Sequence, residues 1–330
     1  MTFTRRAHPD ARLSLFESEW TPPPEALLAI ELSERGLRAP FLHDDIESIL
    51  SLLSSHTLPS FSSESTVSSR PAWRYSPQDG TFSCTVKAPE SLEALPKNVG
   101  VKGGVARSLL LSILGIPSLT PRDIDLIRKG SFNVPLDEEL ARTYMFDDYR
   151  FGARVELFDS VTKHLGSRDI TINEVMYING VLTCTPFAIL DALTLTLRPS
   201  RYRGGTLSRP PQLLGRVLLK LLRLRAEMTF SGTLWRVVGI PEDVTFGEFD
   251  LALHVEKSLQ RSTEIAESFL DHVHLAGFLG HIDGTFLMPV LEELVHLTIG
   301  DSAVIRSIPE ELATELQKSY SLNFTDNESR

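Results

Sequence analysis

Cysteine is nearly absent from this chain, which has 2 cysteines among its 330 residues. Cys84 and Cys184 stand far apart in the sequence, so they form neither the closely spaced pairs of a zinc site nor a disulfide framework. Cysteines of this kind usually pack as small buried hydrophobic residues. We therefore expect no cysteine-bound metal ion and no set of stabilising disulfide bonds.

Long apolar runs are also missing. No run reaches the length of a membrane-spanning helix, and residues 1–6 lack the apolar core of a secretory signal. We therefore expect an intracellular protein, in the cytoplasm, that has no membrane partner. A chain of 330 residues is long enough to form two domains. The sequence leaves the oligomeric state open.

Acidic residues are lacking in one long segment, although the formal net charge of the whole chain is −10. The segment spans residues 192–226 and holds eight basic residues: Arg198, Arg201, Arg203, Arg209, Arg216, Lys220, Arg223 and Arg225. Such a segment can bind the phosphates of RNA. Its arginines can equally pack against the acidic residues that follow residue 241. The sequence leaves both interpretations open.

A glycine pair, Gly103 and Gly104, stands between a predicted strand over residues 99–101 and a predicted helix over residues 105–114. Glycine has no Cβ, so backbone N–H groups at such a turn can approach phosphate oxygens closely. Arg107 follows in the predicted helix and would neutralise charge on those phosphates. The turn is therefore a candidate phosphate-binding site.

Two aspartates, Asp123 and Asp125, are separated by one residue at a predicted strand over residues 124–128. Side chains alternate between the two faces of a strand, so both carboxylates project from one face. A pair of carboxylates in this arrangement can hold two Mg²⁺ ions beside a nucleoside triphosphate. Asp123 and Asp125 are therefore the candidate metal ligands.

A third motif, Arg168-Asp169-Ile170-Thr171-Ile172-Asn173, follows these two. The glycine pair, the aspartate pair and this third motif, in this order, resemble the motifs of the DNA polymerase β-type nucleotidyltransferase superfamily. The third one resembles a motif of CCA-adding enzymes and bacterial poly(A) polymerases. The resemblance covers residues 98–230. It includes two later stretches that form a helix and a return strand in that family: Ile189-Leu190-Asp191-Ala192-Leu193 and Leu197-Arg198.

This resemblance implies an α/β nucleotidyltransferase head with a small mixed sheet at residues 96–205 and a mainly helical domain at residues 206–330. Residues 1–95 contain a serine-rich loop, and the resemblance implies no role for them. The implied activity is the transfer of an NMP from an NTP to an acceptor hydroxyl, with release of pyrophosphate. We expect an RNA or tRNA 3′ end as the acceptor.

The resemblance also implies roles for individual residues. Two Mg²⁺ ions at Asp123 and Asp125 would activate the attacking hydroxyl and stabilise charge on the α-phosphate. Many members of the superfamily use a third carboxylate from a neighbouring strand. The predicted strand over residues 153–158 offers Glu156 and, just after it, Asp159, and of the two we favour Glu156.

The third motif would bind the nucleotide. By resemblance, Arg168 contacts the triphosphate, Asp169 accepts a hydrogen bond from a ribose hydroxyl, and Asn173 holds the sugar and the loop. Asp169 can also cap the helix that we expect to start at Ile170. Further along the chain, Arg216 and Lys220 share one face of a predicted helix over residues 212–228 and would contact phosphates.

The chain departs from the family in three places. Ser108 replaces the aspartate that usually follows the arginine of the glycine motif, and Ser167 replaces the first arginine of the third motif. Residues 210–216 contain no acid, whereas the family reads the incoming base there with a Glu-Asp-x-x-Arg element. Because an arginine alone offers only donors, we expect weak selection of the base.

Two alternatives keep part of this interpretation. In one, the enzyme transfers an NMP to a protein or to a small-molecule acceptor, which suits the lost base-reading element and the acidic net charge. In the other, the chain is a catalytically silent relative that binds nucleotide or RNA. The presence of both Asp123 and Asp125 favours an active enzyme.

Overall fold

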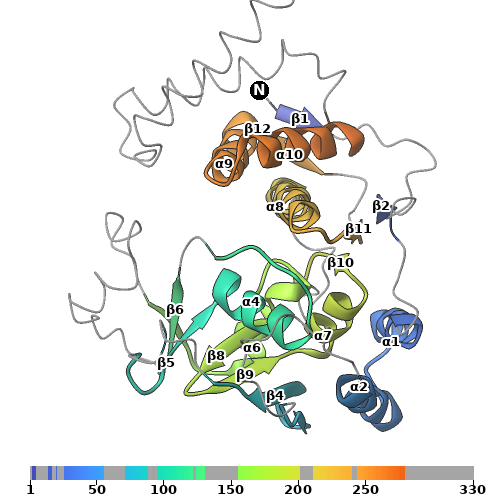
Figure 1. Cartoon of the computed structure of the whole chain (residues 1–330), viewed down its shortest axis with the longest axis vertical. Coiled ribbons are helices and arrows are strands. Elements are labelled where there is room, and N and C mark those ends of the chain that lie inside the picture. The colour runs from blue at the N-terminus through green and yellow to red at the C-terminus, as the bar shows by residue number, and fades with distance from the viewer. Residues whose placement is uncertain are drawn as a thin grey trace, which may run out of the picture. The chain divides into compact units, whose positions relative to one another are not determined.

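The computed structural model describes residues 2–4, 14–16, 20, 26–55, 71–87, 92, 95–121, 124–130, 155–200, 211–239 and 244–278. The protein is a mixed α/β protein with a seven-stranded mixed sheet and a C-terminal helical stretch (Figure 1). The chain divides into two compact units. The larger unit comprises residues 13–209 and 227–240, and the smaller unit comprises residues 1–12, 210–226 and 241–330.

The seven-stranded sheet forms the centre of the larger unit. Its strands, in spatial order, are β3 (Arg74–Ser76), β4 (Thr81–Thr85), β9 (Val181–Cys184), β8 (Val175–Ile178), β5 (Val99–Lys102), β6 (Asp125–Lys129) and β7 (Glu156–Phe158). Neighbouring strands are antiparallel except β6 and β7, which are parallel. Because β3 and β4 precede residue 96, the sheet extends beyond the range expected for the head.

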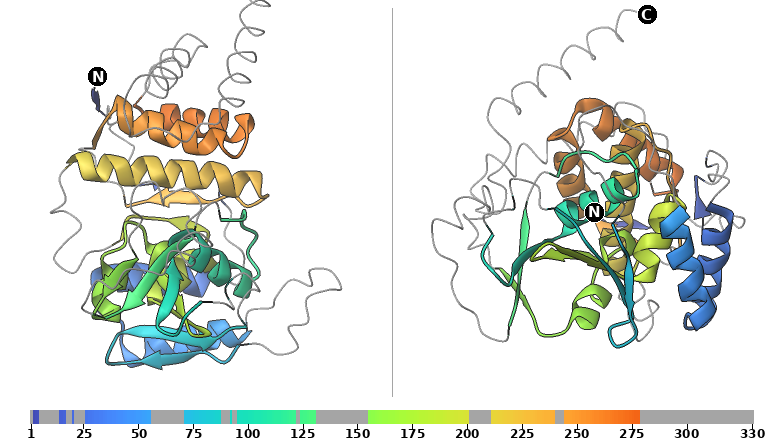
Figure 2. Two further views of the ribbon diagram at one scale, coloured as in Figure 1. Left: turned by 90° about the vertical axis from the view of Figure 1, so that its left-hand side faces the viewer. Right: turned by 60° about the horizontal axis from the view of Figure 1, so that its bottom comes forward.

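Side-chain alternation gives the sheet two faces. Val101 of β5 pairs with Leu126 of β6 on one face, and both are buried. On the other face, Ile127 and Phe158 form a hydrophobic cluster with Leu165 of helix α6 (Val161–Gly166). Helix α4 (Gly103–Ile113) follows β5 directly and packs against β5 and β8 (Figure 2). The strands that carry the glycine turn and Asp125 are therefore adjacent and fixed by packing.

The helical elements of the larger unit include α1 (Leu27–Arg38), α2 (His43–Ser55) and α7 (Pro186–Leu193). α1 packs against α7. The helix expected at Ile170 is only a 3₁₀ turn, η3 (Thr171–Asn173). Ile170 itself has an extended backbone and forms a β-bridge with Pro199, and β8 begins at Val175. These constraints leave no room for an α-helix.

A three-stranded sheet completes the larger unit. It consists of β10 (Thr196–Leu197), β11 (Arg236–Val238) and β2 (Ser14–Leu15) in the order β10-β11-β2. Trp20 attaches the N-terminal part of the chain to this region: its indole N–H donates to the Thr194 carbonyl at 3.1 Å, and the Arg236 guanidinium lies 3.9 Å from the ring centroid. Trp20 and β2 are therefore packed within the larger unit, whereas β1 belongs to the smaller one.

The smaller unit contains α9 (Glu248–Leu259), α10 (Thr263–Leu275) and most of α8 (Pro211–Phe230), with a two-stranded sheet of β1 (Thr2–Thr4) and β12 (Thr245–Gly247). The helical pattern over residues 248–275 is divided in two because the Ser262 side chain caps α10. Helical periodicity also predicts a helix over residues 287–297, which lie outside the described residues. Among the described helices, none is long and apolar enough to cross a membrane.

Candidate active site

The glycine turn and the aspartate strand meet at Gly103. This residue begins α4 with φ of +61°, a left-handed conformation that glycine adopts without a steric penalty. Asp125 begins β6, and its Oδ2 atom lies 2.4 Å from the position that a Cβ at residue 103 would take. A side chain at residue 103 would therefore displace the Asp125 carboxylate. Asp123, the other predicted metal ligand, lies outside the described residues.

The first and third motifs are joined by hydrogen bonds. Arg107 projects from α4, and its Nη1 donates to Oδ1 of Asn173 at 2.7 Å. Asn173 is the last residue of η3, and its Nδ2 donates to Oδ1 of Asp169 at 3.1 Å. Three residues predicted to bind one nucleotide thus form a continuous chain from α4 to the third motif.

Asp169 does not have the capping role that the sequence also allowed, because Ile170 is the N-cap of η3 and no side chain caps this turn. Its Oδ1 atom accepts a hydrogen bond from the backbone N–H of Ile170 at 2.9 Å. The same oxygen accepts from Asn173, so this carboxylate fixes the backbone ahead of η3 and the side chain at its end. The bond to Ile170 does not test the predicted contact with a ribose hydroxyl, which stays a prediction.

Glu156 and Asp159, the two candidates for a third carboxylate, have different surroundings. Glu156 begins β7 and pairs with Ile127, two residues after Asp125 on β6. By strand alternation, Glu156 and Asp125 project from the same face of the sheet. Asp159 is 69% exposed and forms a 3.7 Å ion pair with exposed Lys163. Of the two, Glu156 is the one that strand register places on the face of Asp125, and its role as a third carboxylate stays a prediction.

Three side chains surround the Glu156 carboxylate. Nη2 of Arg168 donates to Oε1 at 2.5 Å, Nδ1 of His164 lies 3.1 Å from the same oxygen, and Nζ of Lys102 donates to Oε2. The hydrogen bonds from His164, Arg168 and Lys102 hold the pKa of Glu156 well below its ordinary value, although burial opposes them. Burial lowers the pKa of His164, so its ring is neutral at pH 7.

The predicted metal site can be tested against these surroundings. The Asp125 carboxylate beside the glycine turn is the kind of hard oxygen ligand that Mg²⁺ prefers, so it fits the ion. Glu156 does not fit as a ligand, because cationic side chains already occupy both of its oxygens. In the described part of the chain, no three or more His, Cys, Asp and Glu side chains gather in a possible metal-binding group.

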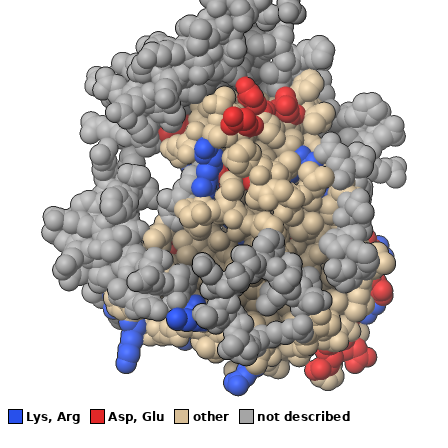
Figure 3. All heavy atoms as spheres, in the orientation of Figure 1, with Lys and Arg blue, Asp and Glu red and all other residues tan. Residues whose placement is uncertain are grey.

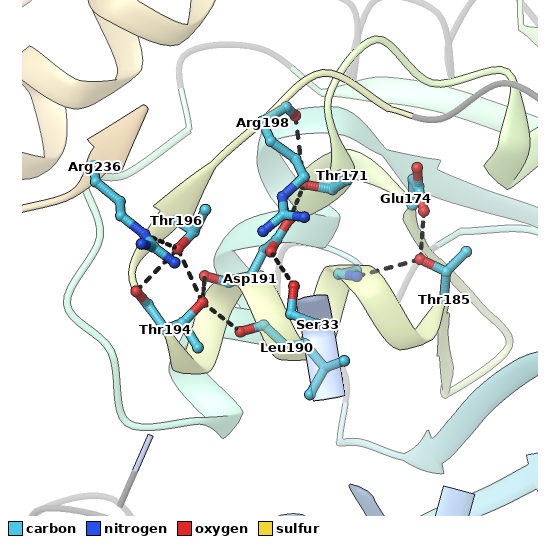
Figure 4. A network of polar contacts seen from close by, with 11 residues as sticks. Ser33, Thr171, Glu174, Thr185, Leu190, Asp191, Thr194, Thr196, Arg198 and Arg236 are labelled. Carbon is cyan, nitrogen blue, oxygen red and sulfur yellow. Dashed lines mark hydrogen bonds and ion pairs between the residues drawn. The ribbon is translucent and has the colours of Figure 1, made fainter. Parts of the chain in front are cut away.

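A buried polar network includes Thr171, the first residue of η3 (Figure 4). Its centre is Asp191 of α7, whose Oδ2 accepts from Thr171 at 2.6 Å and lies 3.0 Å from Nε of Arg198. Ser33 of α1 lies 3.5 Å from the other oxygen of Asp191. Thr171 also donates its backbone N–H to the Arg198 carbonyl. The network therefore connects α1, α7 and the strand end at Arg198 to η3.

Glu174 occupies the end of η3 that leads into β8. The Thr185 hydroxyl donates to its Oε2 at 2.5 Å, and the same hydroxyl accepts from the Ala188 N–H as the N-cap of α7. Burial raises the pKa of Glu174 to about 7, although the bond from Thr185 opposes this. A carboxyl group that titrates near neutral pH thus adjoins Asn173 of the candidate site.

The predicted phosphate-binding face of α8 lies in the smaller unit, and its residues have unequal exposure. Arg216 is 62% exposed and its Nε lies 2.8 Å from Oδ1 of Asp250. Lys220 is half-buried, whereas Arg223 is buried and donates to Nδ1 of His254. On the face seen in Figure 3, the described Lys and Arg side chains are scattered and form no continuous patch.

Two residues of the site were not singled out from the sequence. Lys102 directly precedes the glycine pair, and this adjacency was the available signal. His164 carries no such signal, because only the packing of α6 on β7 brings it to Glu156. The chain matches no model of a known protein family, and no curated protein is significantly similar to it in sequence.

Proposed function

We propose that this protein is a Mg²⁺-dependent nucleotidyltransferase whose head is of the CCA-adding and poly(A) polymerase type. It transfers an NMP from an NTP to an acceptor hydroxyl and releases pyrophosphate. The observation that supports this most directly is the meeting of Asp125 with the Gly103 turn, from motifs that are distant in the sequence. The hydrogen bond between Arg107 and Asn173 adds the third motif to the same region.

In this proposal each group has a distinct task. Backbone N–H groups at Gly103 and Gly104 bind the β- and γ-phosphates, and Arg107 adds a positive charge. Asp169 binds the ribose. Asn173 fixes the positions of the Asp169 and Arg107 side chains through its two hydrogen bonds. Mg²⁺ held by Asp123 and Asp125 would supply charge neutralisation at the α-phosphate.

An RNA 3′ end, such as that of tRNA, is the acceptor that the resemblance implies. A protein or small-molecule acceptor is the second candidate. The burial of Arg198, Arg223 and Arg225 favours this second candidate, because these arginines of the basic segment are not exposed to the phosphates of an RNA. Arg201, Arg203 and Arg209 lie outside the described residues.

The test is a labelling experiment with each of the four NTPs, Mg²⁺ and total RNA or total protein. Asp125→Asn keeps the size of the side chain but removes its charge, so transfer should fall by several orders of magnitude. The control is Asp271→Asn, which removes an exposed carboxylate of α10. Transfer by Asp125→Asn within about threefold of wild type would exclude the proposed metal role. Nucleotide binding without labelling of either pool would instead identify a silent relative.

A further inference from the structure

Lys102 occupies a special position at the candidate site. It is the last residue of β5 and directly precedes the left-handed Gly103 turn. In the antiparallel pairing of β5 with β6 it lies opposite Asp125. Directly opposite residues of paired strands project from the same face of a sheet. Lys102 therefore brings a positive charge to the face that carries Asp125.

Glu156 holds this lysine together with Arg168. Nζ of Lys102 donates to Oε2 of Glu156, and Arg168 donates to both carboxylate oxygens, at 2.5 Å to Oε1 and 3.4 Å to Oε2. The Lys102 side chain is 19% exposed and the Arg168 side chain 14% exposed, so the carboxylate fixes two largely buried cations side by side. The backbone carbonyl of His164 also accepts from Nε of Arg168.

Lys102 and Arg168 share the Glu156 carboxylate, so two positive charges flank one negative charge. A second carboxylate, that of Asp125, projects from the same face opposite Lys102. A divalent cation at Glu156 would be repelled by both neighbours, and an anion at the exposed side of the pair would be attracted by both. Ammonium and guanidinium groups fixed beside a glycine turn are well suited to bind phosphate oxygens.

We propose that Glu156 is a positioning residue and not a metal ligand, and that it holds Lys102 and Arg168 as a cation pair that binds a polyphosphate beside the Gly103 turn. The identification of this polyphosphate with the triphosphate of an NTP rests on the proposed function. The anion site itself rests on the contacts of Lys102, Glu156 and Arg168.

The experiment measures binding of inorganic tripolyphosphate to the full chain by calorimetry in the presence of EDTA. Lys102→Met should weaken binding by about tenfold or more, as expected for the loss of a charge-assisted hydrogen bond. Lys102→Arg should retain most of the affinity because it keeps the charge. The matched control, Lys163→Met, removes the same charge from a side chain that is 78% exposed on α6 and should bind as wild type does.

Glu156→Gln separates positioning from simple electrostatics. Removal of a negative charge alone would tighten binding of an anion, whereas loss of the group that fixes both cations should weaken it severalfold. In a second measurement, Mn²⁺ binding is followed by electron paramagnetic resonance. Glu156→Gln should leave Mn²⁺ affinity within about threefold of wild type, while Asp125→Asn should reduce it by more than about tenfold.

Three results would overturn the proposal. The first is unchanged tripolyphosphate binding in Lys102→Met, or no binding by wild type. The second is tighter tripolyphosphate binding in Glu156→Gln, and the third is a loss of Mn²⁺ affinity in Glu156→Gln as large as in Asp125→Asn. If Glu156→Gln does not fold, the two Lys102 variants still decide the question. Lys102-dependent binding without any transfer of labelled NMP would refute the proposed function and leave the anion site standing.

Discussion

Glu174 lies beside a buried ion pair, that of Asp191 with Arg198. Burial raises the pKa of its carboxyl group to about 7, with the nearby Asp191 acting in the same direction and Thr185 and Arg198 acting against it. In the unfolded chain the same group has an ordinary pKa of 4.5. The folded protein therefore binds the Glu174 proton more tightly than the unfolded chain does.

This difference makes the stability of the fold depend on pH. Well below pH 4.5 Glu174 is protonated in both the folded and the unfolded state, so it does not change the free energy of unfolding. As the pH rises from 4.5 to 7, the unfolded chain releases the proton first, so the free energy of unfolding falls. The glutamine side chain of the variant Glu174→Gln cannot ionise. The variant should therefore be more stable than wild type at pH 8, by as much as about 3 kcal/mol, and similar to wild type near pH 4.5.

Urea unfolding of both proteins at several pH values between 4.5 and 8 measures this effect. Glu47→Gln, a change at an exposed position of α2, is the control and should follow wild type throughout. A stability difference between Glu174→Gln and wild type that stays constant over this range would contradict the raised pKa.

The sequence identified many single residues of the candidate site but few of their contacts. Gly103, Asp125, Arg107 and Asn173 stand in recognisable motifs, and the structure joins them in pairs. Glu156 was predicted as a possible third carboxylate because of its strand, yet its partners come from β5, α6 and the third motif. Such contacts depend on how separate elements pack, which a local pattern does not contain.

Helix α4 begins at a residue where glycine is favoured for two separate reasons. Gly103 has a left-handed backbone, and the Asp125 carboxylate lies where its Cβ would be. Gly232 follows α8 with φ of +87° and has no atom within 4 Å of its Cβ position. Gly232→Ala should therefore lower the free energy of unfolding only by the cost of a left-handed backbone at alanine, which is about 1–2 kcal/mol.

Gly103→Ala should cost more than Gly232→Ala, because the new methyl group also displaces Asp125. The difference between their free energies of unfolding, measured by urea denaturation, should be up to about 1 kcal/mol, because only the end of the Asp125 side chain has to move. Gly103→Ala should in addition weaken Mn²⁺ binding, whereas Gly232→Ala should not. Equal losses of stability in the two variants would mean that the turn does not fix the carboxylate.

The regular elements were predictable where a local pattern is strong. The apolar spacing at residues 44–53 predicts α2, and the alternation at residues 81–86 predicts β4. The hairpin of β8 and β9 was not foreseen. β8 is almost fully buried and shows no polar alternation, and short apolar runs of this kind do not distinguish a strand from a helix.

Charge is the property of the whole molecule that sequence patterns described least well. Helical spacing placed Arg216 and Lys220 on one face of α8, and Arg223 shares their basic segment, but contacts with other helices give the three residues different surroundings. Arg223 is buried against His254 of α9, while Arg216 remains exposed beside Asp250. The basic segment therefore offers fewer exposed charges than its composition suggests.

The partner of Arg216 also changes the argument about base selection. The sequence has no acid at residues 210–216, but Asp250 of α9 supplies a carboxylate to Arg216 from another part of the chain. One oxygen of Asp250 lies 2.8 Å from Nε of Arg216, and the other accepts from the Gly247 N–H at 3.4 Å. A donor and an acceptor group therefore do occur together here. Asp250→Asn is the variant that tests whether they read a base.

The last prediction concerns binding of RNA and its dependence on salt. The Arg216 side chain is 62% exposed, although that of Asp250 is only 13% exposed, so the guanidinium can still contact a phosphate. Arg216→Ala with Lys220→Ala should weaken RNA binding at low salt. The slope of log K against log salt should become shallower by about one to two, since fewer counterions are released. Filter binding at several KCl concentrations measures this slope, and Arg38→Ala with Lys163→Ala removes equal charge elsewhere as the control.

We expect Asp250→Asn to leave the preference among the four NTPs unchanged. The reason is that Arg216, in this interpretation, contacts phosphates and does not read the base. Loss of one nucleotide alone in Asp250→Asn would instead assign base selection to the pair of Arg216 with Asp250.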